Sequence, residues 1–287
     1  MFQKAKREQV KVKVALIGPS GSGKTYTALR LASGIGGKIA LLDTEAGRSK
    51  YYADEFEFDI AELNAPYSPE RYIEIIQEAE KQGYDTLIID SITHEWSGPG
   101  GILEIHSKMP GNSFANWSKI NPRHNKFLEA ILYSNMHIIA TIRGKDQYVL
   151  EQDEKGRQVP KKVGMGGVQR DGIEYEYTCT FLLDVESHVA TTQKDNTHLF
   201  EGKYEVLTEE HGKMLKEWAE SGVKPVKMVN KQTVAAILSF VKQSEVAKNI
   251  TRDMLKEKGY TDWDGLNMFS QEDADKLLEE IRSAVME

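Results

Sequence analysis

The chain has 287 residues, of which 40% are hydrophobic and 28% are charged, and its net charge is −7. This composition is typical of a globular protein with its own core, and the length suits one α/β domain with an appendage. It excludes several classes. No run of about 18 apolar residues could span a membrane. The basic N-terminus has no apolar signal region, and one cysteine, Cys179, cannot form an internal disulfide. We expect a cytoplasmic protein without a membrane partner.

Five short runs of β-branched and apolar residues are the expected strands, with helical stretches between them. The strands span residues 12–17, 38–42, 85–90, 137–142 and 177–185, and the helices span 24–33, 69–82 and about 122–134. Continuous apolar strands that alternate with helices predict a mostly parallel sheet covered by helices on both faces. Residues 97–121 and 144–167 are long for connections in a compact domain, so we expect mobile functional loops there.

The last 57 residues have a purely helical pattern. Asn230 is expected to cap a first helix, which carries an apolar stripe at helical spacing. Thr251 is expected to cap a second, short helix that ends at Gly259. Ser270, followed by Asp273, resembles a capping box that opens a last helix. These signals predict a small, all-helical C-terminal module.

The composition between these two regions is that of a linker. Residues 221–225 read SGVKP, and a glycine and a proline in so short a stretch are typical of a break between structured segments. We therefore predict two domains, residues 1–222 and residues 223–287. Because so few residues make a marginal core, the helical module is expected to lean on the first domain or on a neighbouring molecule.

The segment between the first strand and the first helix reads GPSGSGKT and matches the phosphate-binding pattern G-x-x-x-x-G-K-[ST] without deviation. In such a turn the backbone N–H groups cradle phosphates, the lysine bridges the β- and γ-phosphates, and the hydroxyl ligates Mg²⁺. The sequence therefore predicts binding of ATP or GTP with Mg²⁺, with ATP as the expected nucleotide. The nucleotide-binding residues are expected to be Gly18, Pro19, Ser20, Gly21, Ser22, Gly23, Lys24, Thr25 and Tyr26, with Lys24 also catalytic.

An aspartate ends the apolar strand DTLIID. Asp90 follows the phosphate-binding turn by about 65 residues and runs into Ser91. An aspartate at this place holds the Mg²⁺ shell, which is the Walker B role. Thr25 and Asp90 are therefore the predicted metal-binding residues.

The run LLDTE, residues 41–45, resembles the segment of RecA-type recombinases in which an apolar strand ends in D-x-E. In that family the glutamate polarises the attacking water, so the resemblance implies that Glu45 is the catalytic base. Asp43 and Glu45 could instead only cap a loop. Glu95, in DSITHEW, is the competing base because it follows Asp90 closely. In AAA+ proteins, by contrast, the glutamate directly follows the Walker B aspartate.

Two later segments resemble further parts of the same family. HIIATIR, residues 137–143, resembles the strand that ends in a γ-phosphate sensor, which implies that Thr141 or Arg143 contacts the nucleotide. The segment TQKDNTHLF resembles a late segment that places lysines against ATP of the adjacent protomer. Lys194 is the implied trans-acting cation, with Lys203 second. Each of these residues could equally be an ordinary strand or hairpin residue.

The basic segment between Arg143 and Arg170 contains seven Lys or Arg against four Asp or Glu, which gives a local charge of +3. Such a segment can hold a polyanion, because distant acidic groups are screened within about 10 Å. The resemblance implies that it corresponds to the second DNA-binding loop of RecA-like proteins. Its candidate contacts to single-stranded DNA are Arg143, Lys145, Tyr148, Lys155, Arg157, Lys161 and Lys162, with the ring of Tyr148 available for base stacking.

Together these motifs resemble the compact RecA-like ATPases of bacteriophages, over roughly residues 12–205. The resemblance implies a DNA-stimulated ATPase that anneals single strands in recombination, in the host cytoplasm. It also implies a homo-oligomer, ring or filament, with ATP at the subunit interface, and a single-strand-binding protein is a further candidate partner. The alternative is a P-loop ATPase that loads a helicase or remodels protein assemblies. A small-molecule kinase is the third class, although the chain lacks an obvious Arg-rich lid.

Overall fold

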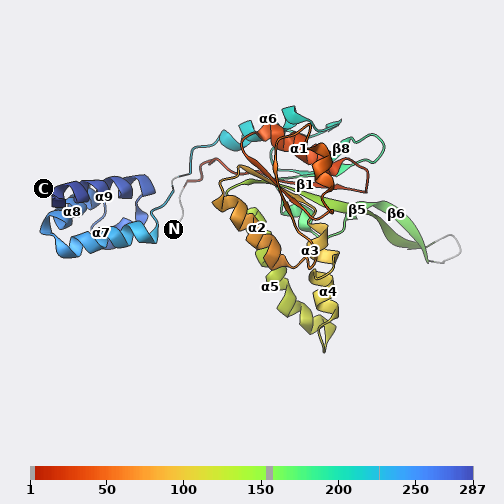
Figure 1. The fold of residues 1–287 in the computed structure, drawn as a ribbon, viewed down its shortest axis with the longest axis horizontal. Coiled ribbons are helices and arrows are strands. Elements are labelled where there is room, and N and C mark those ends of the chain that lie inside the picture. The colour runs from red at the N-terminus through yellow and green to blue at the C-terminus, as the bar shows by residue number, and fades with distance from the viewer. Residues whose placement is uncertain (1–3, 153–157, 226, 287) are drawn as a thin grey trace. The chain divides into compact units, whose positions relative to one another are not determined.

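The structure is a computed structural model that describes residues 4–152, 158–225 and 227–286 (Figure 1). The chain divides into two compact units, Met1–Gly222 and Val223–Glu287. The first unit is built on a mixed sheet, and the second consists of helices. The α/β fold with a helical C-terminal segment, which the strand and helix patterns predicted, is confirmed.

The central sheet has the strand order β3-β2-β4-β5-β1-β7-β8-β9, and β6 pairs only with β5. In this order, the six strands β3, β2, β4, β5, β1 and β7 run parallel to one another. Strands β8 and β9 are added antiparallel at one edge. The carboxyl ends of the parallel strands therefore meet along one edge of the sheet. The strands are β1 (Lys13–Gly18), β2 (Ile39–Asp43), β3 (Asp59–Glu62), β4 (Thr86–Asp90), β5 (His137–Gln152), β6 (Gln158–Gly167), β7 (Cys179–Leu183), β8 (Ala190–Asp195) and β9 (Tyr204–Glu205).

Helices cover both faces of this sheet. Alternate strand residues point to opposite faces, so Leu16 joins the core under α1 (Lys24–Ile35) and α6 (Glu209–Glu220). Its neighbour Ile17 joins the core under α2 (Pro69–Lys81) and α5 (Ser113–Leu132). The strands β1, β2 and β4 are buried on both sides, which explains why their sequences are continuous apolar runs instead of alternating ones.

Two glycines bring α1 and α6 into backbone contact. A Cβ on Gly34 would lie 1.9 Å from the carbonyl oxygen of Glu209, and a Cβ on Gly212 would lie 2.2 Å from that of Leu31. No other residue type fits such a separation. The helix that begins at the phosphate-binding turn is therefore seated directly on α6, and the ion pair of Arg30 with Glu209 at 2.9 Å closes the same contact.

The two segments expected to be long loops contain regular structure, and that expectation is wrong. Residues 97–121 hold α4 (Ile102–Ser107) and the first half of α5, and residues 144–167 form most of the β5–β6 hairpin. Helix α5 begins at Ser113, not near Pro122, because the side chain of Asn112 accepts a hydrogen bond from the N–H of Phe114 and caps the helix there. Pro122 lies inside the helix.

The C-terminal unit packs three helices and a 3₁₀ turn around its own small core. Asn230 caps α7 (Lys231–Gln243) and Ser270 caps α9 (Gln271–Met286) as expected, since each side-chain oxygen accepts an N–H three residues on. The cap expected at Thr251 is wrong. Its hydroxyl donates to the carbonyl of Ala247 inside α8 (Glu245–Glu257), which begins after Ser244. The 3₁₀ turn is η3 (Trp263–Met268).

Candidate functional site

The turn between β1 and α1 has the conformation of a phosphate cradle. Gly23 adopts the left-handed φ of +81°, which lets the turn enter α1 directly. The hydroxyl oxygen of Ser22 is buried and has no hydrogen-bond partner among the described residues. Lys24 donates from Nζ to the carbonyl of Pro19 at 2.7 Å, and burial lowers the pKa of this lysine. An unpartnered buried hydroxyl and a partly desolvated cation in one turn fit a bound polyphosphate.

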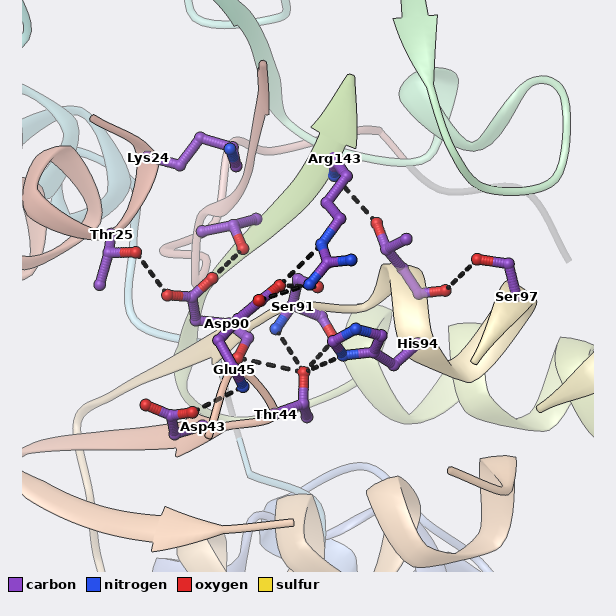
Figure 2. A network of polar contacts seen from close by, with 12 residues as sticks. Lys24, Thr25, Asp43, Thr44, Glu45, Asp90, Ser91, His94, Ser97 and Arg143 are labelled. Atoms are coloured by element: carbon purple, nitrogen blue, oxygen red, sulfur yellow. Dashed lines mark hydrogen bonds and ion pairs between the residues drawn. The ribbon is translucent and has the colours of Figure 1, made fainter. Parts of the chain in front are cut away.

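Asp90 lies at the centre of the site, at the end of β4. Its carboxylate accepts hydrogen bonds from the hydroxyl of Thr25 at 2.6 Å and from that of Thr141 at 2.5 Å (Figure 2). Asp90 is 3% exposed, and burial raises the pKa of its carboxyl. Residues from α1, β4 and β5 therefore meet at the carboxylate of Asp90. Thr141, which was expected to contact the nucleotide, donates its hydroxyl hydrogen bond to Asp90.

Asp43 and Glu45 follow the end of β2, which is in register with β4 so that Asp43 is paired with Asp90. The Asp43 carboxylate accepts the N–H groups of Glu45 at 2.7 Å and of Gly47 and Ser49 at 3.1 Å each. Asp43 thus organises the loop, whereas Glu45 lines the pocket that also contains residues of the phosphate-binding turn. The two acidic residues of D-x-E have different functions in the structure.

The carboxylate of Glu45 is held by Arg143 in a two-pronged ion pair. The Arg143 Nε donates to Oε1 at 2.9 Å, its Nη2 donates to Oε2, and the hydroxyl of Ser91 lies 3.3 Å from Oε1 (Figure 2). Partial burial acts to raise the pKa of Glu45, but the hydrogen bonds and charge of Arg143, with help from His94 and Ser91, bring it below its ordinary value. Glu45 is therefore an anion at neutral pH.

An open pocket of about 890 Å³ joins these groups. Its lining includes most of the phosphate-binding turn, Glu45, Asp90 and Arg143, and also the tyrosines Tyr26, Tyr51 and Tyr52. The ring of Tyr26 packs edge-on against Tyr52 at 5.5 Å and Phe56 at 5.3 Å, which makes a firm aromatic wall. A pocket lined by both charged and aromatic residues suits a ligand with a charged and a flat part, as a nucleotide has. Sequence analysis missed these lining residues: Arg30, Arg48, Tyr51, Tyr52, His188 and Val206.

Two residues considered for catalysis lie away from this pocket. Glu95, in α3 (Thr93–Ser97), is fully buried against His124 and Gln169 and does not line the pocket. Lys194 in β8 donates from Nζ to the carbonyl of Tyr175, and it does not line the pocket either. Within this single chain the structure brings Glu45 to the phosphate-binding turn and leaves Glu95 outside the site.

The residues expected to contact DNA are distributed over the β5–β6 hairpin. Arg143 is at its root and turns back to Glu45, and Lys145 is exposed beside it. Tyr148, Lys161 and Lys162 fall on the paired strands of the hairpin, where the structure describes the backbone. Lys155 and Arg157 lie outside the described residues.

Residues 10–211, more than half of the chain, match the family described as AAA domain. The chain belongs to the AAA domain family. It is thus an ATPase of the P-loop kind, and the matched range takes in the phosphate-binding turn, Glu45, Asp90 and Arg143. As a member of the AAA domain family it uses a nucleotide, usually with Mg²⁺. Among its described helices, none is both long and apolar enough to cross a membrane.

Proposed function

We propose that this AAA domain protein is a RecA-like ATPase that couples ATP hydrolysis to binding of single-stranded DNA, in annealing or recombination, and that it is encoded by a bacteriophage. The observation that carries the proposal is the ion pair between Glu45 and Arg143. It joins an acidic residue at the end of β2 to the root of a projecting hairpin whose segment carries a local charge of +3.

For hydrolysis, each group has one task. Lys24 and the N–H groups of the turn bind the β- and γ-phosphates, and Glu45 accepts the proton of the water that attacks the γ-phosphorus. The bond from this phosphorus to the β,γ-bridging oxygen breaks, which releases ADP and phosphate. Thr25 and Asp90 are the residues that would hold Mg²⁺, which neutralises phosphate charge when bound. Arg143 lines the same pocket as Lys24, so its guanidinium can sense the γ-phosphate.

The aromatic wall gives the nucleotide base a place. Tyr26 and Tyr52 line the pocket, and planar bases stack on such rings. The pocket is open, so an adjacent protomer could cover it. This is consistent with a homo-oligomer that has ATP at the subunit interface. In that arrangement Lys194 acts on the ATP of a neighbour, which agrees with its distance from the pocket of its own chain.

The first test is Glu45→Gln. Loss of the proton acceptor should lower ATP turnover by about 10²–10⁴-fold, while nucleotide affinity stays within about twofold because no phosphate-binding group is removed. Turnover is measured by phosphate release and affinity by a fluorescent nucleotide. Glu74→Gln, an exposed residue of α2, is the matched control and should leave both unchanged. Unchanged turnover in Glu45→Gln would contradict the assignment of the base.

The DNA part of the proposal is tested by ATP turnover with and without a single-stranded oligonucleotide, at low and at moderate salt. Stimulation that weakens as salt rises is expected, because Lys and Arg contacts to phosphates release counterions. Replacing Lys161 and Lys162 together by glutamate should remove the stimulation and leave basal turnover intact. Good turnover without any response to DNA would favour the alternative function, a helicase loader or remodeller of protein assemblies.

A further inference from the structure

A buried polar network lies beside the site but outside the pocket. The side chains of Glu95 in α3 and His124 in α5 are 0% and 1% exposed. The Nδ1 atom of His124 lies 3.1 and 3.2 Å from the two carboxylate oxygens of Glu95. The rings of Trp96 and His124 are 5.2 Å apart, and Trp117 stacks on Trp96 at 5.9 Å, so aromatic rings pack beside this buried hydrogen-bonded pair.

Gln169 connects this pair to the segment that follows Asp90. From Nε2 it donates to the carbonyl of Ile92 at 3.1 Å and to Oε2 of Glu95 at 3.2 Å. Its own Oε1 accepts the N–H of Arg170 at 2.7 Å. Gln169 is 5% exposed and follows the outgoing strand of the hairpin, β6, by two residues. One side chain therefore fixes the exit of the hairpin on α3 and on Glu95.

Three successive residues after Asp90 make contacts that converge on the catalytic carboxylate and on both ends of the hairpin. The hydroxyl of Ser91 lies 3.3 Å from the carboxylate of Glu45. The carbonyl of Ile92 accepts from Gln169, at the hairpin exit. The hydroxyl of Thr93 accepts the N–H of Arg143 at 2.9 Å, at the hairpin entry. Any displacement of this tripeptide would thus move the partners of Glu45.

Helix α3 has only five residues and cannot hold its own position. Leucine at position 95 and phenylalanine at position 124 would fill a similar volume without burying a carboxylate. The polar pair is the less favourable choice for packing alone, because it also leaves Nε2 of His124 without a partner among the described residues. What hydrogen bonds provide beyond apolar packing is direction, since each has a fixed length and angle.

Given the ATP hydrolysis proposed above, we infer that Glu95 is a positioning residue for it, acting with His124 and Gln169. The three side chains fix residues 91–93, and through them the orientation of Glu45 and Arg143. Glu95 touches neither nucleotide nor water at the reaction centre.

The test exchanges the two hydrogen-bonding partners. In Glu95→Gln an NH₂ group replaces one carboxylate oxygen, so Nδ1 of His124 keeps at most one of its two acceptors. In Gln169→Glu a carboxylate faces that of Glu95. The double variant E95Q/Q169E restores a donor opposite an acceptor between positions 95 and 169, although the carbonyl of Ile92 stays without its donor. Gln169→Met, which keeps length and apolar volume, is a milder variant that retains the contact between Glu95 and His124.

Positioning predicts a fall in kcat of at least tenfold in each single variant, with the Kd of a fluorescent ATP analogue within twofold and with cooperative thermal unfolding retained. The double variant should recover kcat to at least threefold above the lower single variant. Unchanged kcat in Gln169→Met and Glu95→Gln would overturn the inference. So would effects that simply multiply in the double variant, since the two side chains would then act independently.

Two further outcomes separate this inference from the proposed function. Complete loss of turnover in Glu95→Gln without recovery in the double variant would make Glu95 the base and overturn its positioning role. If the wild-type protein releases no more phosphate than Lys24→Ala, the proposed hydrolysis fails, and a positioning role for it falls as well. If the wild-type protein releases more phosphate than Lys24→Ala but the single variants are unchanged, the positioning role is overturned and the proposed hydrolysis stands.

Discussion

Strand β1 has one lysine at its start and another just beyond its end, and the two differ in what surrounds them. Lys13 is 5% exposed and donates from Nζ to the carbonyls of Ser134 at 2.8 Å and Met136 at 2.6 Å. Lys24 donates to the carbonyl of Pro19 and lines the open pocket. Burial lowers the pKa of both, for Lys13 to about 7.

The comparison teaches that a perturbed lysine does not by itself mark a functional site. At the start of β1 the ammonium group is enclosed and the backbone satisfies it, and neighbouring His137 is neutral because burial lowers its pKa to about 3. At the other end the cation has one backbone partner and space for an anion. Access to a pocket, not the direction of the pKa shift, separates a binding lysine from a structural one.

The largest expected effect is the loss of ATP turnover when the pocket lysine is replaced. Lys24→Ala should abolish ATP turnover, a loss of at least about 100-fold, because the main cation for the β- and γ-phosphates is removed. Lys13→Met is the matched variant and should leave kcat within about twofold. Phosphate release measures both. Equal losses in the two variants would mean that the pocket is not what distinguishes these lysines.

A smaller effect concerns stability at the enclosed end. The pKa of Lys13 falls from 10.5 to about 7 on folding, so between these values the unfolded chain binds more protons than the folded one. The free energy of unfolding contributed by Lys13 therefore rises with pH across this window, by about 2 kcal/mol from pH 7 to 9. Urea unfolding at both pH values measures this. Lys13→Met should lack this part of the rise, and an equal rise in both proteins would contradict the buried assignment.

The smallest effect sharpens the comparison at the site itself. Arg143→Lys keeps a positive charge but cannot grip both oxygens of Glu45, so we expect about a tenfold loss of kcat, equivalent to about 1.4 kcal/mol. The same change at exposed Arg48, on the pocket rim, is the control and should cost less than about threefold. Steady-state kinetics at saturating ATP measure kcat of both variants. An unchanged kcat in Arg143→Lys would mean that the two-pronged ion pair does not contribute to catalysis.

Local signals predicted much of this architecture. The glycines and lysine of residues 18–25 and the apolar strand before Asp90 are contiguous, so their conformation follows from short-range rules. The helix caps at Asn230 and Ser270 could be predicted for the same reason, since a cap depends on neighbouring residues. The predicted helix start at Pro122 failed because Asn112, a capping residue ten positions earlier, was overlooked and a proline is usually a first-turn residue.

Long-range contacts were beyond the sequence patterns. No sequence pattern near Glu95 predicts its contacts with His124 and Gln169, which are 29 and 74 residues away. Glu45 and Glu95 therefore both remained candidates for the catalytic base. The different functions of Asp43 and Glu45 likewise depend on the loop around Ser49. Tyr51 and Tyr52 had a weak signal in KYYADEF, which begins three residues after the end of LLDTEAG and could have indicated a lining segment.

The glycine contact between α1 and α6 has a consequence for engineering. Because Gly34 and Gly212 bring two backbones together, neither helix can be exchanged for a homologous one that carries a side chain at these positions. A chimera that grafts a new C-terminal module onto this ATPase core should therefore keep α6 and be joined after Glu220, the last residue of that helix. Swaps made before Glu209 would remove the support of the phosphate-binding helix together with the appendage.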